Sequence, residues 1–185
     1  PKEEIKKLIN SVKKNRNSCH IIGAYALGKA QRVMNLLRQN NYSDTIYIHG
    51  SLEKLCNYYR SQKINIGLFE KVVSKDRSFY EGKIIIAPPS ALKDRWSRRF
   101  PNPIICMASG WMTVKQRAKQ RGIELPLVIS DHSDWNELLD TIKKSKAKNI
   151  LVTHGQEDAL VHYCKLNNLF SEPLSIQGRG DEEIE

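Results

Sequence analysis

Short apolar runs alternate with stretches of helical spacing along this chain, and that alternation limits most strongly the folds open to it. The first striped stretch, at 5–12, leads into an apolar run at 19–22, and the same change of period recurs at 30–48 and again from 128 onward. Side chains repeat every 3.6 residues on a helix and every 2 on a strand, so repeated switching indicates helices packed on a sheet. We therefore expect an α/β fold.

The apolar runs predict strands and the striped segments predict helices. Strands are expected at 19–22, 45–48, 83–87, 103–108, 128–129 and 150–152, and helices over 5–12, 30–37, 52–59, 135–142 and 160–164. The weakly patterned segment 64–79 is expected to form a loop or short strands, and the basic segment 115–121 a surface connection. Asp134 and Glu137 are spaced to cap the start of the helix at 135–142 reciprocally.

Charge is divided sharply along the sequence. Residues 1–122 hold 24 Lys and Arg against 8 Asp and Glu, whereas residues 123–185 hold 6 against 12, which gives +16 and −6 within the total of +10. A face with that much positive charge attracts polyanions, and aromatic rings among arginines suit base stacking. The predicted nucleic-acid contacts are Lys29, Arg95, Trp96, Arg98, Arg99, Lys115 and Arg117. A solvated basic surface without a ligand is the alternative.

Several classes of protein are disfavoured by composition. With 40% hydrophobic and 27% charged residues in 185, the chain has ordinary globular composition, and no apolar run approaches the roughly 20 residues that span a bilayer. We expect a cytoplasmic protein without a membrane partner. The four cysteines are scattered singly, which favours buried reduced thiols. Because the first residue is Pro1, we expect a processed chain or an excerpt of a longer one.

Two histidines follow expected strands directly. His132 comes after the run at 128–129 and His154 after the run at 150–152. The carboxyl ends of strands are where open α/β sheets place ligands and catalytic groups, and imidazole both binds zinc and titrates near neutrality. Metal ligation and proton transfer both stay open for these two residues, whereas His20, His49 and His162 have no ligand-like spacing.

Four motifs occur in an order that carries a family resemblance. They are Ala26-Leu27-Gly28-Lys29-Ala30-Gln31, Met107-Ala108-Ser109-Gly110-Trp111-Met112, Ser130-Asp131-His132-Ser133-Asp134-Trp135 and Val152-Thr153-His154-Gly155. The series resembles the C-terminal half of β-CASP nucleases of the metallo-β-lactamase superfamily. It is most similar to the bacterial ligase-associated DNA exonucleases, which are also called messenger-RNA 3′-end processing factors.

The resemblance implies a fold and a substrate class. Residues 1–122 would form a three-layer β-CASP cap with a parallel-rich sheet, and residues 123–185 would form the C-terminal strand-helix units of a metallo-β-lactamase αββα domain. In that family DNA or RNA binds between cap and metal domain, so we expect a nuclease portion acting in DNA repair or RNA processing. A DNA ligase is an expected partner by family association.

The resemblance also implies roles for three residues. His132 matches the histidine that protonates the leaving oxygen of the cleaved phosphodiester, and His154 matches a ligand of one of two zinc ions. Asp134 would orient an imidazole next to the metal, or would only cap its helix.

One family motif is missing. No H-x-H-x-D-H occurs in this sequence, although that motif supplies most of the two-zinc site in the family. We therefore expect an excised domain, the product of a split gene or a relic, which lacks most zinc ligands and is inactive without a companion half that carries them.

Two other classes of function stay open. A nucleic-acid-binding module without catalysis fits the same charges. An α/β nucleotide-binding domain is the other, because Gly23 to Lys29 has the spacing G-x-x-x-x-G-K. In that run Ala30 stands where a phosphate-binding loop needs the hydroxyl that holds magnesium.

Overall fold

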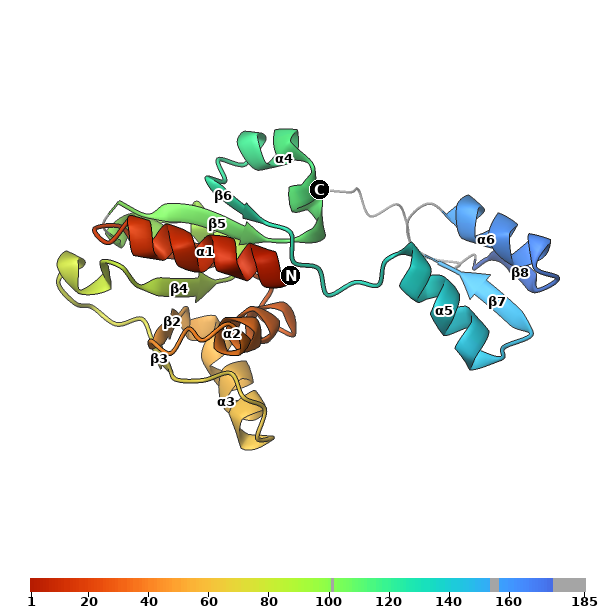
Figure 1. The fold of residues 1–185 in the computed structure, drawn as a ribbon, viewed down its shortest axis with the longest axis horizontal. Coiled ribbons are helices and arrows are strands. Elements are labelled where there is room, and N and C mark those ends of the chain that lie inside the picture. Colours follow the sequence, from red (N-terminus) through yellow and green to blue (C-terminus); the bar gives the residue numbers. More distant parts are fainter. Residues whose placement is uncertain (101, 154–156, 175–185) are drawn as a thin grey trace. The chain divides into compact units, whose positions relative to one another are not determined.

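A computed structural model describes residues 1–100, 102–153 and 157–174 of the chain. They belong to two compact units, Pro1–His132 and Ser133–Glu185, called here the first and the second unit (Figure 1). The sequence prediction divides the chain at residue 122, whereas the strand at Leu125–Leu127 pairs within the sheet of the first unit. The assignment of the two parts to a cap and a metallo-β-lactamase domain stays a prediction.

The first unit is built on a six-stranded sheet in which every described pairing is parallel. Its strands are β1 (His20–Gly23), β2 (Ile46–Ile48), β3 (Phe69–Lys71), β4 (Ile84–Ala87), β5 (Ile104–Ala108) and β6 (Leu125–Leu127), and their order is β3-β2-β4-β1-β5-β6. The central strands β1 and β4 are buried along their whole length, as their unbroken apolar sequences require. The prediction of an α/β fold with a parallel-rich sheet is confirmed.

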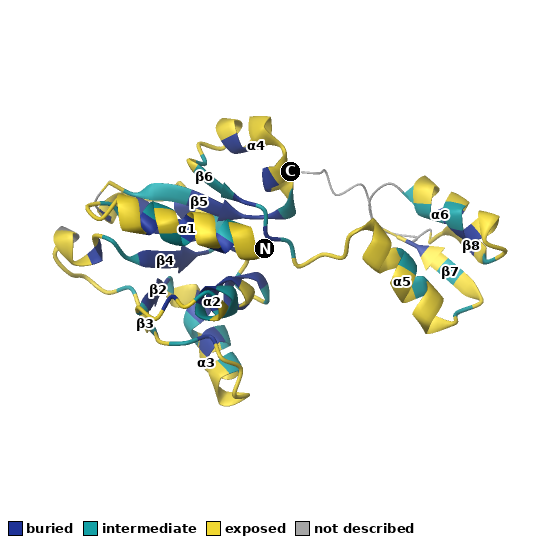
Figure 2. Cartoon of the chain, in the orientation of Figure 1, coloured by how far each residue is buried: buried dark blue, intermediate teal, exposed yellow. Residues whose placement is uncertain are grey.

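Two layers of helical segments cover the two faces of this sheet (Figure 2). One face packs against α1 (Lys2–Lys14), α2 (Lys29–Gln39) and α3 (Glu53–Ser61), whose apolar stripes meet Ile22, Ile84 and Ile86. The other face packs against α4 (Lys115–Gln120) and four short 3-10 turns, and its core holds Ile21, Ile85 and Met107. These four turns are η2 (Arg77–Tyr80), η3 (Pro89–Leu92), η4 (Ser97–Arg99) and η5 (Gly110–Thr113). A fifth turn, η1 (Gly50–Leu52), packs with α1, α2 and α3 instead. The result is the expected three-layer arrangement.

The second unit has fewer elements. It contains α5 (Trp135–Ser145), β7 (Asn149–Val152), α6 (Glu157–Leu166) and β8 (Phe170–Pro173), and β7 pairs with β8 in parallel. The side chain of Asp134 accepts a hydrogen bond from the backbone N–H of Glu137, and the Glu137 carboxylate accepts one from the N–H of Asp134. This reciprocal cap starts α5 as the spacing predicts.

Two elements differ from their predictions. The strand expected at 128–129 lies at Leu125–Leu127 and contains Pro126, which β6 tolerates because it is an edge strand and needs fewer ladder donors. Residues 115–120 form a helix that buries Ala118 rather than a surface connection.

The four cysteines are buried, as expected. No helix among the described residues is long and apolar enough to cross a membrane.

Candidate functional site

The carboxyl ends of β1, β5 and β6 meet at one edge of the parallel sheet. The segments that follow these strands line a cavity of about 390 Å³, with Tyr25 and Lys29 after β1, Ser109 and Trp111 after β5, and His132 after β6. Parallel strands that end together place their loops side by side, which is why residues over 100 positions apart line one cavity. Residues of three of the four family motifs are therefore brought together in the first unit.

His132 stands at the end of the first unit with its side chain 85% exposed. Its backbone N–H donates to Ser130 Oγ at 3.1 Å, and its Nε2 lies 3.8 Å from Asp131 Oδ1. The tight turn fixes the backbone while leaving the imidazole accessible from solvent. An exposed imidazole beside a carboxylate is able to hold a proton and pass it on.

Lys29 lies in a different environment from the other predicted phosphate contacts. Only 3% of its side chain is exposed, and its Nζ lies 2.9 Å from Asp131 Oδ1 and 5.0 Å from the centre of the Tyr25 ring. Partial burial acts to raise the pKa of Asp131, but the hydrogen bond and charge of Lys29 outweigh it and hold the pKa below its usual range. Lys29 thus has a partner within the chain and ties the start of α2 to the turn that carries His132.

The first of two basic runs, residues 93–100, forms a cluster of cations around aromatic rings. Arg95, Arg98 and Arg99 are exposed, and the Arg99 guanidinium lies 5.4 Å from the centre of the half-buried Trp96 ring. The Trp96 ring in turn packs edge-on against Phe100 at 4.9 Å and His49 at 4.8 Å. Burial and the positive charge of Arg99 lower the pKa of His49, which is what a positive local potential does to a histidine.

The second basic run, residues 115–121, brings a further arginine onto an exposed ring. Lys115 and Arg117 are exposed at the start of α4, and the Arg117 guanidinium lies 4.0 Å from the centre of the Trp111 ring. Trp111 is 62% exposed, an unusual position for so large a ring. Among the described residues, none of the exposed arginines and lysines predicted as contacts forms a salt bridge. Their charge is therefore available to an anionic ligand.

The predicted metal-site residues belong to the second unit. The carboxylate of Asp134 caps α5, so the structure accounts for it without a metal. His154 lies outside the described residues. Within 1–100, 102–153 and 157–174, no group of three or more His, Cys, Asp and Glu side chains is arranged to hold a metal ion. The described residues therefore do not fit a zinc site by themselves.

A family model matches the segment that contains His132 and His154. Residues 127–168 match the Zn-dependent metallo-hydrolase RNA specificity domain, and this range runs from the end of β6 through α6. The match supports the resemblance to β-CASP nucleases. The matched segment is thus similar to a domain whose description links a metallo-hydrolase with RNA specificity.

A curated relative extends the likeness over more of the chain. A protein named "Probable DNA ligase" from Opitutus terrae (strain DSM 11246 / JCM 15787 / PB90-1) is 23% identical over 135 residues. The match covers 73% of this chain and 13% of that protein, so the chain spans only a small part of the relative. Together the two findings support a β-CASP-like nuclease relationship, as the sequence motifs predict.

Some residues of the candidate site were missed by sequence reasoning. Asp131 lies in the third motif without a predicted role, and nothing in a sequence pairs it with Lys29, 102 positions earlier. Trp111 belongs to the second motif but has no predicted role, although a tryptophan directly after Ser-Gly at a strand end is a signal for an exposed ring. Lys93 and Arg121 belong to the two basic runs, yet their convergence on one pocket appears only in the fold.

Proposed function

We propose that the chain is the nucleic-acid-binding, C-terminal portion of a metal-dependent nuclease. The observation that carries the proposal is the set of exposed, unpaired cations beside aromatic rings in the first unit, which holds 24 Lys and Arg against 10 Asp and Glu. Guanidinium groups bind phosphate and rings stack on bases, so this surface suits single strands of DNA or RNA. The matching family model supports the same class of ligand.

Within that function, His132 is the proposed general acid. Its imidazole would donate a proton to the leaving oxygen as the phosphorus–oxygen bond of the phosphodiester breaks. The exposed position of the ring at the strand-end cavity, with Asp131 Oδ1 3.8 Å away, supports this role. His154 is proposed as a zinc ligand by resemblance alone. We propose further that the protein works in the cytoplasm in DNA repair or RNA processing, and the relative named a probable DNA ligase supports a link to ligation.

Salt dependence tests nucleic-acid binding. The affinity for a labelled single-stranded oligonucleotide, measured by fluorescence anisotropy, should fall steeply with salt, with a log–log slope of roughly −2 for three phosphate contacts. Replacing Arg98 and Arg99 by Ala should weaken binding to all sequences alike, because phosphate contacts carry no sequence information. The matched control is the double variant Lys14→Ala and Lys54→Ala, which removes two exposed cations of α1 and α3. Affinity independent of salt would contradict the proposal.

Catalysis needs a companion polypeptide with the H-x-H-x-D-H half. In that complex, alanine variants of the two histidines should lose activity in different ways. His132→Ala should retain zinc and lose about 10²–10⁴ in rate, as expected for a missing general acid. A substrate with a better leaving group should restore its rate. His154→Ala should lose zinc as well as rate, measured by elemental analysis. A non-catalytic binding module, the second candidate, predicts no hydrolysis with any such companion.

A further inference from the structure

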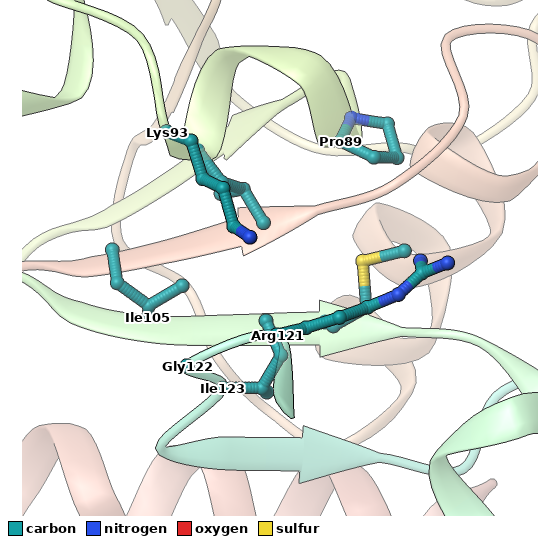
Figure 3. Close-up of a pocket in the computed structure, with 8 residues that line it drawn as sticks. Pro89, Lys93, Ile105, Arg121, Gly122 and Ile123 are labelled. Atoms are coloured by element: carbon teal, nitrogen blue, oxygen red, sulfur yellow. The ribbon is translucent and has the colours of Figure 1, made fainter. Parts of the chain in front are cut away.

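The two basic runs of the first unit meet at one pocket on the α4 side of the sheet. Lys93 follows η3, and Arg121 follows α4, yet both side chains line the same cavity of about 540 Å³ (Figure 3). A cavity of this size lies within the range of roughly 300–1,000 Å³ that is typical of small-molecule sites. The pocket is separate from the cavity that contains His132, because the two share no lining residue.

The floor of this pocket is apolar. It is lined by Leu92, Ile105, Met107 and Ile123, of which Leu92 and Met107 are buried and the two isoleucines are half-buried. In Figure 3 Lys93 lies on one side, with its amine toward the pocket, and Arg121 and Ile123 lie across from it. An apolar slot between two cations is complementary to a flat, weakly polar group that carries negative charge on both sides.

Neither cation has an anionic partner within the described part of the chain. The salt bridges of the described residues involve Lys6, Lys7, Lys29, Lys71, His132 and Lys144, and no described side-chain hydrogen bond uses Lys93 Nζ or the Arg121 guanidinium. Both side chains are exposed, so their charges are solvated in the free protein and remain available to an anionic group that enters the pocket. The pocket is therefore suited to a ligand that carries negative charge.

We propose that this pocket seats one base of a bound single strand, with Lys93 and Arg121 on the phosphates that flank it. This inference rests on the proposed nucleic-acid binding and adds a specific place where the strand is held. Bases taken out of a stack are commonly held between apolar side chains, and a strand supplies a phosphate on each side of every internal base. A free nucleotide presents the same base with phosphate on one side only, so it would engage one cation and leave the other unpaired.

An oligonucleotide that lacks bases separates the pocket from simple charge attraction. A fluorescein-labelled thymidylate decamer should bind the full chain about fivefold or more tighter than the same backbone with abasic sites. Filling the pocket by Ile105→Phe or Ile123→Phe should reduce this preference to the share contributed by exposed rings elsewhere, while the salt dependence stays because both cations remain. Two filling variants are used because either one alone could disturb the fold, which circular dichroism would reveal.

The two cations are tested by their effect on the salt slope. The double variant Lys93→Met and Arg121→Met should make the log–log slope less steep by roughly 1.4, the share of two phosphate contacts on a single strand. The control Lys14→Met and Lys54→Met has the same net charge, with both changes on helices that pack against the opposite face, and should leave the slope unchanged.

The possible failures are distinguishable. If the decamer does not bind at all, the proposed function is wrong. If it binds with the expected salt slope but the abasic strand binds equally well, or if the filled variants keep the full preference, the base pocket is wrong and the charged surface stands. Thymidine monophosphate that competes fully with the decamer would show a site for free nucleotides and overturn the strand assignment.

Discussion

The two units share the same kinds of element but differ in how much of each element they bury. In the first unit both faces of a six-stranded sheet are covered, and the strands at its centre are buried at every position. In the described part of the second unit no residue of α5 is buried, and buried side chains are confined to Val152, Val161, Cys164 and Ser171. Figure 2 shows the contrast between the two.

The difference teaches what an amphipathic pattern does and does not establish. α5 has an apolar stripe as regular as those of α1 and α2, yet Trp135 is 44% exposed and Leu138 39%. Periodicity selects the helical conformation, whereas burial requires a partner surface of matching area. We therefore expect the stability of the first unit to come from its core, and that of the second unit to depend more on local devices such as helix caps.

Truncating matched apolar side chains should give the largest difference between the units. Ile85 is fully buried at the centre of the sheet, so Ile85→Ala should cost about 2–5 kcal/mol of unfolding free energy. Leu138→Ala, at a half-exposed position of α5, should cost no more than about 0.5 kcal/mol. Hydrogen exchange resolved along the chain gives both values. Equal costs would break the comparison and show that the apolar stripe of α5 is covered.

Acid should destabilise the first unit selectively through His20. The ring is fully buried, its Nε2 lies 2.8 Å from Ser11 Oγ, and its Nδ1 has no partner in the described structure. Burial lowers the pKa of His20 from 6.5 to about 4. Between these two pH values the unfolded chain binds a proton at His20 and the folded chain does not. The free energy of unfolding therefore reaches its full value, as far as His20 is concerned, above pH 6.5, and it falls by about 3 kcal/mol as the pH drops to 4.

Two substitutions check this assignment. His20→Gln should remove that part of the pH dependence whatever it does to stability at neutral pH. His162→Gln, at an exposed histidine of the second unit, is the matched control for the loss of one imidazole. A slope that survives in His20→Gln would assign the acid sensitivity to another group.

Most of the fold could be predicted from local patterns, and the exceptions have physical causes. The strands β1, β2, β4 and β5 are apolar runs, and their predicted ranges agree with the structure to within about a residue. β3 (Phe69–Lys71) pairs at an edge and has little apolar sequence to mark it. β6 was displaced in the prediction because Pro126 argues against a strand unless the strand is known to lie at an edge.

The candidate site was less accessible to sequence reasoning, because its parts meet only through tertiary contacts. The motifs singled out His132 and the basic runs, but the burial of Lys29 depends on Asp131 from a distant loop. The pocket between Lys93 and Arg121 depends in the same way on η3 and α4 lying over one face of the sheet. Pairings of this kind require the strand order, which periodicity does not contain.

The smallest predicted effect lies in the second unit and tests whether a cap stabilises α5. Asp134→Ala removes the acceptor that holds the N–H of Glu137 at 2.9 Å, so amide exchange in the first turn of α5 should accelerate by an amount that corresponds to about 1 kcal/mol. Asp134→Ser should exchange these amides at nearly the same rate as the original protein, because a serine hydroxyl caps a helix about as well as a carboxylate. Asp140→Ala, at an exposed interior position of the same helix, controls for loss of charge. If amide exchange accelerated as much in Asp134→Ser as in Asp134→Ala, the carboxylate itself would be required. That result would favour a role for Asp134 in orienting an imidazole over a role as a helix cap.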